Sequence, residues 1–200
     1  MAFQKSISDF KAVLQGGGVR PTMFQVEITF PAGVSADGTD AADRGQFLIK
    51  AAQIPQSTVG VINVPFRGRK LKVSGDRQFA DWNITVINDT SFTLRKTFEK
   101  WAEKIQNHNY ALGATSLSDY YASAIVRQLD RDGTQLRSYG FQGIWPKEVA
   151  EIALDFNTTD THEEYDVNFA VQWWNAIEEG DPYTSAVARD PQAAINAVTS

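Results

Sequence analysis

The chain has 200 residues, a formal net charge of −5 and no cysteine. This length suits a single domain with enough residues to bury a sizeable core. The lack of cysteine excludes disulfides and thiolate chemistry, and the acidic balance argues against tight nucleic-acid binding, which depends on neutralising phosphates. No apolar run is long enough to span a membrane, and the N-terminal MAFQKSISDF lacks the apolar core of a secretory signal.

The N-terminal quarter of the chain predicts an arm, a strand and a long loop. Residues 1–18 are expected to form the arm, with a short helix over 8–15 that ends at three glycines. Apolar residues alternate over 24–30 and predict a strand. Residues 34–46 are small and polar, so we expect a long loop, and 47–64 predicts a hairpin with an exposed tip at Ile-Pro-Gln-Ser-Thr.

The middle of the chain predicts a strand, a turn, a second strand and a helix. A strand is expected to reach Val73, and Ser74-Gly75-Asp76 is expected to turn the chain into a strand over 79–87. Asp89 or Ser91 is the expected cap of a helix over 91–106. The apolar residues of this helix recur at spacings of four, three and four, which indicates one buried face. They are Leu94, Phe98, Trp101 and Ile105.

The remaining sequence predicts further hairpins and a polar tail. Asp-Gly at the centre of 121–143 is a strong hairpin signal, and Ile144-Trp145-Pro146 is expected to bend the chain away. Strands are expected over 149–156 and 164–174, and a tail over 180–200. We therefore predict one mainly β (α+β) domain: an antiparallel β-sandwich or partial barrel of about eight strands with one buttressing α-helix.

The sequence offers little for catalysis. His108 follows the helix and His162 lies in a turn, and neither has the second histidine of a zinc-protease helix. Neighbouring acids such as Glu163 and Glu164 fit a solvated surface better than a glycosidase pair. We therefore expect no enzyme activity, no metal and no cofactor.

The paired aromatics leave a different function open. Neighbouring residues on a strand face opposite sides, so one residue of Trp173-Trp174 and one of Tyr120-Tyr121 is expected to be exposed. An exposed Trp can stack on a sugar, as in a sugar-binding β-sandwich module, or be buried by a partner subunit.

Charge is distributed unevenly along the chain. Nine acids and no Lys or Arg fall within residues 151–181, whereas five basic residues fall within 67–77. Separate basic and acidic stretches allow copies of a chain to attract one another, although both stretches also fit solvated strand faces.

Ordered motifs across the middle of the chain resemble the tail tube protein family of contractile-tailed bacteriophages. They are Pro65-Phe66-Arg67-Gly68-Arg69-Lys70, Ser74-Gly75-Asp76-Arg77, Trp82, Val86-Ile87-Asn88-Asp89 and Phe98-Glu99-Lys100-Trp101, and residues 17–24 are also similar. The resemblance implies a structural virion protein that is assembled in the host cytoplasm and forms homohexameric rings, which stack into a tube inside a sheath. It also implies as partners the tail sheath protein, the tape-measure protein, and the baseplate and tail-terminator proteins. DNA would pass through the lumen without specific binding, and no membrane insertion is expected.

The resemblance also suggests which residues make contacts in the tube. The candidates for contacts between rings are Asp37, Asp43, Arg44, Pro55, Gln56 and Ser57. The candidates for contacts between subunits are Arg67, Arg69, Lys70, Lys72, Glu163, Glu164 and Trp174. The lumen candidates are Lys50, Ala52, Ser123 and Ser138, from two hairpins with small or polar faces. A ring protein of a bacterial secretion tube or of a bacteriocin is the alternative within the same architecture.

Overall fold

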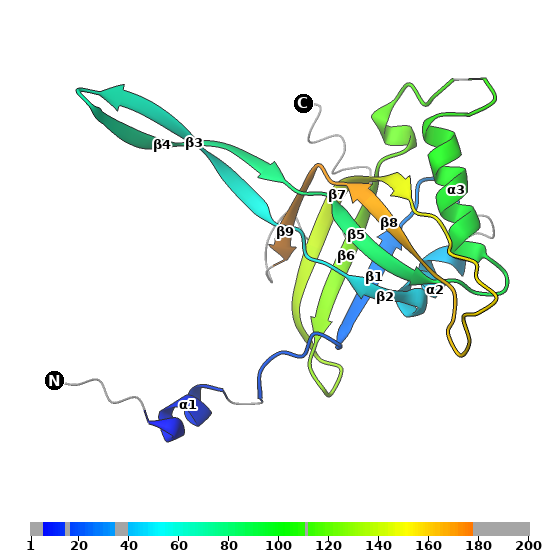
Figure 1. Ribbon diagram of the computed structural model, residues 1–200, viewed down its shortest axis with the longest axis horizontal. Helices are drawn as coiled ribbons and strands as arrows, with labels where there is room; N and C mark the ends of the chain where they lie inside the picture. Colours follow the sequence, from blue (N-terminus) through cyan, green and yellow to red (C-terminus); the bar gives the residue numbers. More distant parts are fainter. Residues whose placement is uncertain (1–5, 15–16, 35–39, 111, 178–200) are drawn as a thin grey trace.

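The computed structural model describes residues 6–14, 17–34, 40–110 and 112–177 (Figure 1). Seven strands form one antiparallel sheet in the order β1-β6-β7-β8-β5-β2, with β9 beside β7, and β3 pairs with β4 alone. The strands are β1 Phe24–Thr29, β2 Ile49–Ala52, β3 Ser57–Phe66, β4 Arg69–Phe79, β5 Trp82–Ile87, β6 Ala122–Leu129, β7 Gln135–Val149, β8 Glu164–Ala170 and β9 Trp173–Ile177. The helices are α1 Ile7–Val13, α2 Asp40–Leu48, α3 Thr93–Ile105 and a 3₁₀ turn at Leu117–Asp119.

Helix α3 packs its apolar face onto the sheet. Leu94, Phe98 and Trp101 are buried, and Ile105 is half-buried. The rings of Phe98 and Trp101 lie 5.8 and 5.9 Å from that of Phe169 on β8. The Trp101 indole N–H donates to the carbonyl of Tyr120 at 2.8 Å, so this large side chain is buried without leaving its polar atom unpaired. The predicted buttressing helix is present.

The two halves of the sheet meet across an aromatic core. Trp82 on β5 stacks on Phe141 of β7, with ring centroids 4.7 Å apart and planes inclined by 17°. Trp82 also lies 5.3 Å from Phe169. Strand β7 joins the halves, because its first part pairs with β6 and β9 and its second part with β8. The predicted mainly β, antiparallel fold is therefore confirmed.

Strand β7 is longer than the sequence suggests. The hairpin of β6 and β7 turns at Asp130–Thr134 as expected. The expected bend at Ile144-Trp145-Pro146 is wrong, because Trp145 to Val149 continue as strand and pair with β8. Both sides of β8 are then occupied, by β5 and by β7. The strand expected over 149–156 has no free partner, and beyond Val149 the chain is irregular and leaves Leu154 and Phe156 exposed.

A helix replaces part of the expected loop over 34–46. Helix α2 runs from Asp40 to Leu48 beside β1, and the Gln25 amide donates to Gln46 Oε1 at 2.6 Å. Ala41 is fully buried, and Gly45 is buried as well. Small residues at these positions let the helix lie close to its neighbours, so tertiary contacts override a composition that is typical of loops. Asp37 lies outside the described residues.

The expected hairpin over 47–64 is wrong. Strand β2 pairs with β5, placing Ala52 opposite Ile84, whereas β3 pairs with β4. Pro55, expected at an exposed tip, is buried where the chain crosses from one sheet to the other. β2 instead extends the main sheet beside β5, whose alternate residues are buried.

The segment Ser74-Gly75-Asp76 is part of a strand and does not form the expected turn. β4 runs through it and is separated from β5 by Ala80 and Asp81. The pairing with β3 shifts register between Val59 and Val61, opposite this segment. A Cβ atom added to Gly75 would lie 3.2 Å from the backbone of Gly60, so glycine allows the two strands to approach closely where the ribbon is irregular.

Among the described residues, no helix is both long and apolar enough to cross a membrane. The tail expected over 180–200 lies outside the described residues.

Candidate assembly interface

Strands β3 and β4 form a ribbon that projects away from the body of the subunit (Figure 1). Its two-residue turn consists of Arg67 and Gly68, which both have positive φ, at 43° and 83°. Two-residue hairpin turns with positive φ at both positions match the twist of paired strands. A two-stranded ribbon is only marginally stable alone in water, so its surface requires a partner.

The outer half of the ribbon has one apolar face. Residues directly opposite each other in an antiparallel pair share a face, and Ile62 lies opposite Val73, Val64 opposite Leu71. Phe66 completes this face next to the turn, opposite Arg69. The five apolar side chains are between 44% and 67% exposed. We call this surface the apolar ribbon face: Ile62, Val64, Phe66, Leu71 and Val73.

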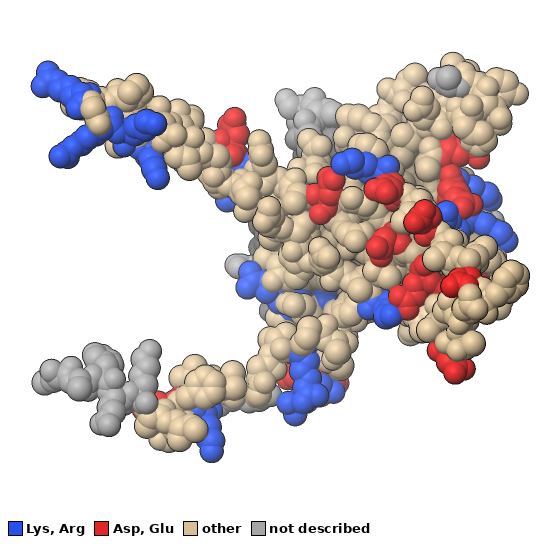
Figure 2. Space-filling view, viewed as in Figure 1, with Lys and Arg blue, Asp and Glu red and all other residues tan. Residues whose placement is uncertain are grey.

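The opposite face of the ribbon is polar and basic. Lys72 lies opposite Asn63 and Lys70 opposite Pro65, which places both lysines away from the apolar ribbon face. Arg67 at the turn lies over the Phe66 ring, 5.4 Å from its centroid. Figure 2 shows the basic side chains gathered at the far end of the ribbon. These basic residues were identified from the sequence, but the apolar ribbon face was missed. The available signal was the alternation of apolar residues at 62, 64 and 66 and at 71 and 73.

The acidic region lies on the body of the subunit. Figure 2 shows acidic side chains gathered around β8. Glu164 accepts from Lys50 Nζ at 2.5 Å and lies 2.9 Å from His162 Nε2. The hydrogen bond from Lys50 lowers the pKa of Glu164, aided by the charge of Lys50 and by His162. Glu163 accepts from the Asn88 amide. These two acids therefore already have partners within the subunit.

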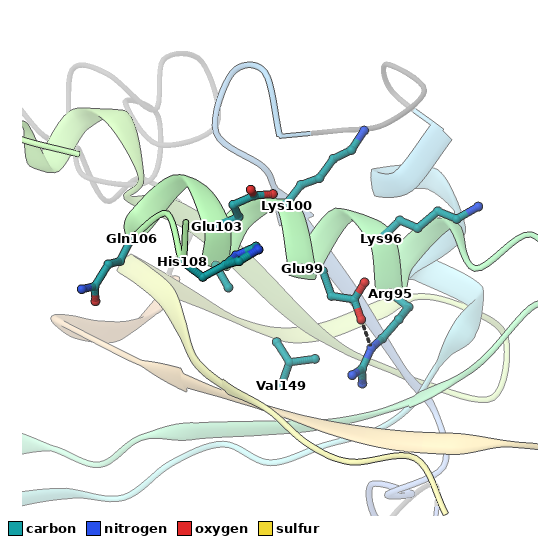
Figure 3. Close-up of a pocket in the computed structure, with 9 residues that line it drawn as sticks. Arg95, Lys96, Glu99, Lys100, Glu103, Gln106, His108 and Val149 are labelled. Carbon is teal, nitrogen blue, oxygen red and sulfur yellow. Dashed lines mark hydrogen bonds and ion pairs between the residues drawn. The ribbon is translucent and has the colours of Figure 1, made fainter. Parts of the chain in front are cut away.

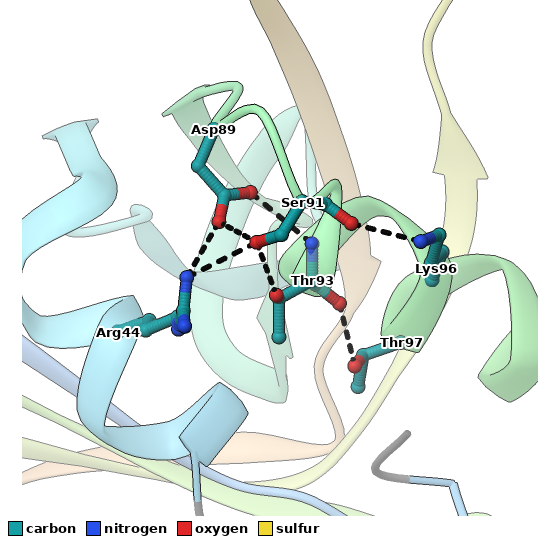
Figure 4. Close-up of polar contacts among 6 residues, drawn as sticks. All are labelled: Arg44, Asp89, Ser91, Thr93, Lys96 and Thr97. Atoms are coloured by element: carbon teal, nitrogen blue, oxygen red, sulfur yellow. Dashed lines mark hydrogen bonds and ion pairs between the residues drawn. The ribbon is translucent and has the colours of Figure 1, made fainter. Parts of the chain in front are cut away.

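The start of α3 is built around Asp89 (Figure 4). The helix begins after Phe92, which has a left-handed backbone and no capping side-chain bond. Asp89 Oδ1 accepts from the Thr93 N–H at 3.1 Å, so it caps the helix from outside the usual position. Ser91 and Arg44 both donate to Asp89 Oδ2, the latter at 2.8 Å. Burial alone would raise the pKa of Asp89, but these hydrogen bonds together hold it below its ordinary value.

A hollow of about 690 Å³ runs along α3 beside Val149 at the end of β7 (Figure 3). The Arg95 side chain donates to Glu99 Oε1 and to the carbonyl of Ala150, each at 2.7 Å. Lys96, Lys100 and Glu103 are exposed beside it. The hollow is open and charged, which suits a polar protein surface better than a small apolar ligand. Its lining is Arg95, Lys96, Glu99, Lys100, Ala102, Glu103, Gln106, His108 and Val149.

The other expected contact residues are scattered. Lys50 is exposed on β2 and Ala52 is half-buried, whereas Ser123 and Ser138 are buried inside the subunit. Asp43 and Gln56 are exposed and Ser57 is half-buried. Arg44, a candidate for contacts between rings, forms an ion pair with Asp89 within the subunit.

The aromatic pairs do not form a free stacking platform. Trp173 and Trp174 are both half-buried, so the expectation that one of them is exposed is wrong. Trp174 lies 6.2 Å from Phe79 and 5.9 Å from Tyr139, ring centroid to centroid. The rings of Tyr120 and Tyr121 contact each other edge to face. The sugar-binding alternative therefore loses the observation that suggested it.

The fold is shared with chains from two larger assemblies. It is similar to a chain of the sheath-tube complex of an extracellular contractile injection system, PVC, with a TM-score of 0.61 and 12% identity over 88% of this chain and 100% of that chain. It is also similar to a chain of the anti-feeding prophage baseplate, with a TM-score of 0.57 and 11% identity over 80% of this chain and 95% of that one. At such low identity these likenesses show the fold.

Sequence relatives identify the family. A model of the phage tail tube protein family matches residues 19–177. The chain is 32% identical to tail tube protein gp19 of Enterobacteria phage T4 over 165 residues, which cover 82% of this chain and 95% of that protein. It is 28% identical to the tail tube protein of Serratia phage KSP90, over 80% of this chain and 90% of that one. The chain belongs to the phage tail tube protein family. It is a non-enzymatic structural protein of a contractile phage tail and a component of the virion.

Proposed function

We propose that copies of this chain close into six-membered rings, and that the β3–β4 ribbon of each copy lies against a neighbouring copy. The observation that carries the proposal is the apolar ribbon face, an exposed surface of five large side chains on a two-stranded element. Exposed apolar area of this kind marks a protein interface in a soluble chain. At about 25 cal/mol per Å² of apolar area buried, covering it supplies a large share of the association energy.

The ends of the main sheet support ring closure. Strands β1 and β2 end the sheet, and each has one neighbouring strand in the described chain. An open strand edge is a site for pairing with another chain, and closing a ring of copies is one way to remove such edges. The anti-feeding prophage baseplate, which contains a chain of similar fold, is 6-fold symmetrised. This symmetry supports the proposed number of copies.

Stacked rings would enclose a conduit for DNA and, before DNA enters, for the tape-measure protein. Lys50 and Ala52 on β2 are lumen candidates with accessible surface, and Lys50 is already paired with Glu164. A wall on which basic groups are neutralised offers few lasting ion pairs to phosphate, so DNA can slide. The buried Ser123 and Ser138 could face the lumen only if assembly rearranged the strands that cover them.

We also propose that the sheath, baseplate and terminator proteins contact the tube from outside and at its ends. Structures of similar fold include a sheath-tube complex, a sheath/tube terminator and a baseplate. Helix α3 lies across the body from the ribbon in Figure 1, so a ribbon engaged with a neighbour leaves the hollow along α3 accessible. This face is the candidate contact for the sheath.

Electron microscopy of purified protein over a concentration series tests the ring proposal. Wild-type protein is expected to form rings or tubes of uniform width, and Leu71→Ser is expected to reduce their yield strongly. Leu154→Ser is the matched control, because Leu154 is also an exposed leucine but lies away from the ribbon. Equal tube yield from both variants would remove the role given to the apolar ribbon face.

A further inference from the structure

Helix α1 is encoded locally, and its side chains are exposed within the part of the chain that the structure describes. The Ser6 hydroxyl accepts from the Asp9 N–H at 3.2 Å, and Asp9 Oδ2 accepts from the Ser6 N–H at 3.0 Å, which completes a capping box. None of its residues is buried. A helix of seven residues is marginal in water even when well capped, so it requires a surface to pack on.

One side of α1 is apolar. Ile7, Phe10 and Leu14 recur at spacings of three and four, which places them on one stripe, and Val13 lies beside it. Ile7 is 76% exposed and Phe10 62%. Asp9 lies away from this stripe and Lys11 borders it beside Ile7, so the helix is amphipathic and its apolar side has no cover in the described subunit.

The arm that carries α1 lies outside the region that the family model matches. The family model begins to match at residue 19, after the helix and its glycines. Gly17 and Gly18 both have φ of +79°, a conformation that other residues rarely adopt. They form a joint between α1 and the body. In Figure 1 the arm and the ribbon project from the same side of the body.

We propose that α1 of one copy packs its apolar stripe on the apolar ribbon face of a neighbouring copy in the tube. This proposal rests on the proposed function, and it names the segment that covers the ribbon. The sizes are comparable: seven helical residues span about 10 Å, and Ile62 to Phe66 span about 14 Å of strand. Ile7, Phe10 and Leu14 can therefore cover most of the length of the face.

The ribbon of a second copy fits better than the ribbon of the same chain as the surface on which α1 packs. Each copy offers one helix and one ribbon, so a repeated head-to-tail exchange covers both surfaces in every copy. If α1 covered its own ribbon, the subunit would bury the surface that drives association before any neighbour arrived. Exchange between copies couples the burial of both surfaces to assembly.

The absence of natural cysteine permits a direct test by disulfide cross-linking. Phe10→Cys and Leu71→Cys are combined in one chain, assembled, oxidised and run on a non-reducing gel. A disulfide forms only where the Cα atoms approach within about 7 Å. We expect a ladder of multimers and the loss of most of the monomer band. Ile7→Cys with Val73→Cys is a second pair, which can still cross-link if α1 lies at a shifted position along the ribbon.

The matched control combines Phe10→Cys with Lys70→Cys, which is next to Leu71 but on the other face, and no ladder is expected. Mixing chains that carry only Phe10→Cys with chains that carry only Leu71→Cys before assembly should give cross-linked dimers. Tubes that form normally while both pairs give only internally cross-linked monomers, or no cross-link, would overturn this proposal alone. Failure of the wild-type chain to form rings or tubes would instead overturn the proposed function.

Discussion

Arg44 Nη1 lies 2.8 Å from Asp89 Oδ2 and joins helix α2 to the start of helix α3. The side chains are 42% and 18% exposed, so the pair is only partly screened by water. Asp89 also accepts from the Thr93 N–H at the first turn of α3. One carboxylate therefore both caps the buttressing helix and holds α2 against it. This contact gives Arg44 a structural role within the subunit.

Asp89→Ala should destabilise the subunit. It removes a helix cap, which costs about 1 kcal/mol, and it removes one acceptor of Arg44 and of Ser91. Urea unfolding followed by tryptophan fluorescence measures the change. Asp43→Ala is the control, because Asp43 is exposed on α2, and its effect should be within about 0.5 kcal/mol. Equal effects of the two substitutions would contradict the role of Asp89.

Asp89 should also contribute to the pH dependence of stability. Its pKa in the folded subunit is lowered, so the unfolded chain binds more protons near its ordinary pKa of about 4. The stabilisation is fully present above that pH and is lost as the pH falls through the folded pKa. Unfolding free energies at pH 7 and pH 3 should differ less for Asp89→Asn than for the wild type. The same pH dependence in both proteins would show that Asp89 does not contribute.

Disrupting the aromatic stack in the core should cost more unfolding free energy than removing Asp89. Phe141 is fully buried against Trp82, so Phe141→Ala should cost about 3–5 kcal/mol of unfolding free energy through lost burial and a cavity. Phe156→Ala is the matched control, because Phe156 is fully exposed in the loop after β7 and should change stability little. Thermal unfolding by circular dichroism compares the two. A large loss from Phe156→Ala would show that this loop packs against the body.

The elements that could be predicted from sequence are those with local signals. Helix α3 has its apolar period within its own residues, and the β6–β7 hairpin has Asp-Gly at its turn, so neither depends on distant parts of the chain. The pairing of β2 was mispredicted because its partner, β5, lies some thirty residues further on, beyond the ribbon. Gly75 looked like a turn residue because glycine suits both a turn and a close approach of two strands.

The interface was only half predictable for a similar reason. Arg67, Arg69, Lys70 and Lys72 were identified by their charge alone. The apolar ribbon face depends on the register that brings Val64 opposite Leu71, and that register follows from the turn at Arg67-Gly68. An expected hairpin over 47–64 assigned β3 to the wrong partner and hid the pattern.

Charge reversal on the ribbon should weaken assembly. Arg69 and Lys70 lie next to the turn, and among the described residues neither forms an ion pair within the subunit. We propose the acidic region around β8 of a neighbour as the complementary surface, so the double variant Arg69→Glu and Lys70→Glu should lower tube yield. Lys100→Glu on α3 is the control and should leave the yield unchanged. Unchanged tube yield from the double variant at physiological salt would remove this contact.

Charge on α3 should matter for the sheath and not for the tube. Lys96 and Lys100 are exposed beside the hollow along α3. Lys96 Nζ also donates to the carbonyl of Ser91 at 2.8 Å, and Arg95 is held by Glu99 and by the backbone of Ala150. Lys96→Glu with Lys100→Glu should therefore form tubes of normal width but recruit less sheath protein when the two proteins are expressed together. Electron microscopy counts sheathed and bare tubes.

The conservative pair Lys96→Arg and Lys100→Arg should keep the sheath, because it preserves the charge. Full sheathing of the charge-reversed tubes would place the sheath contact on another face, whereas the loss of tubes would show that α3 takes part in ring contacts.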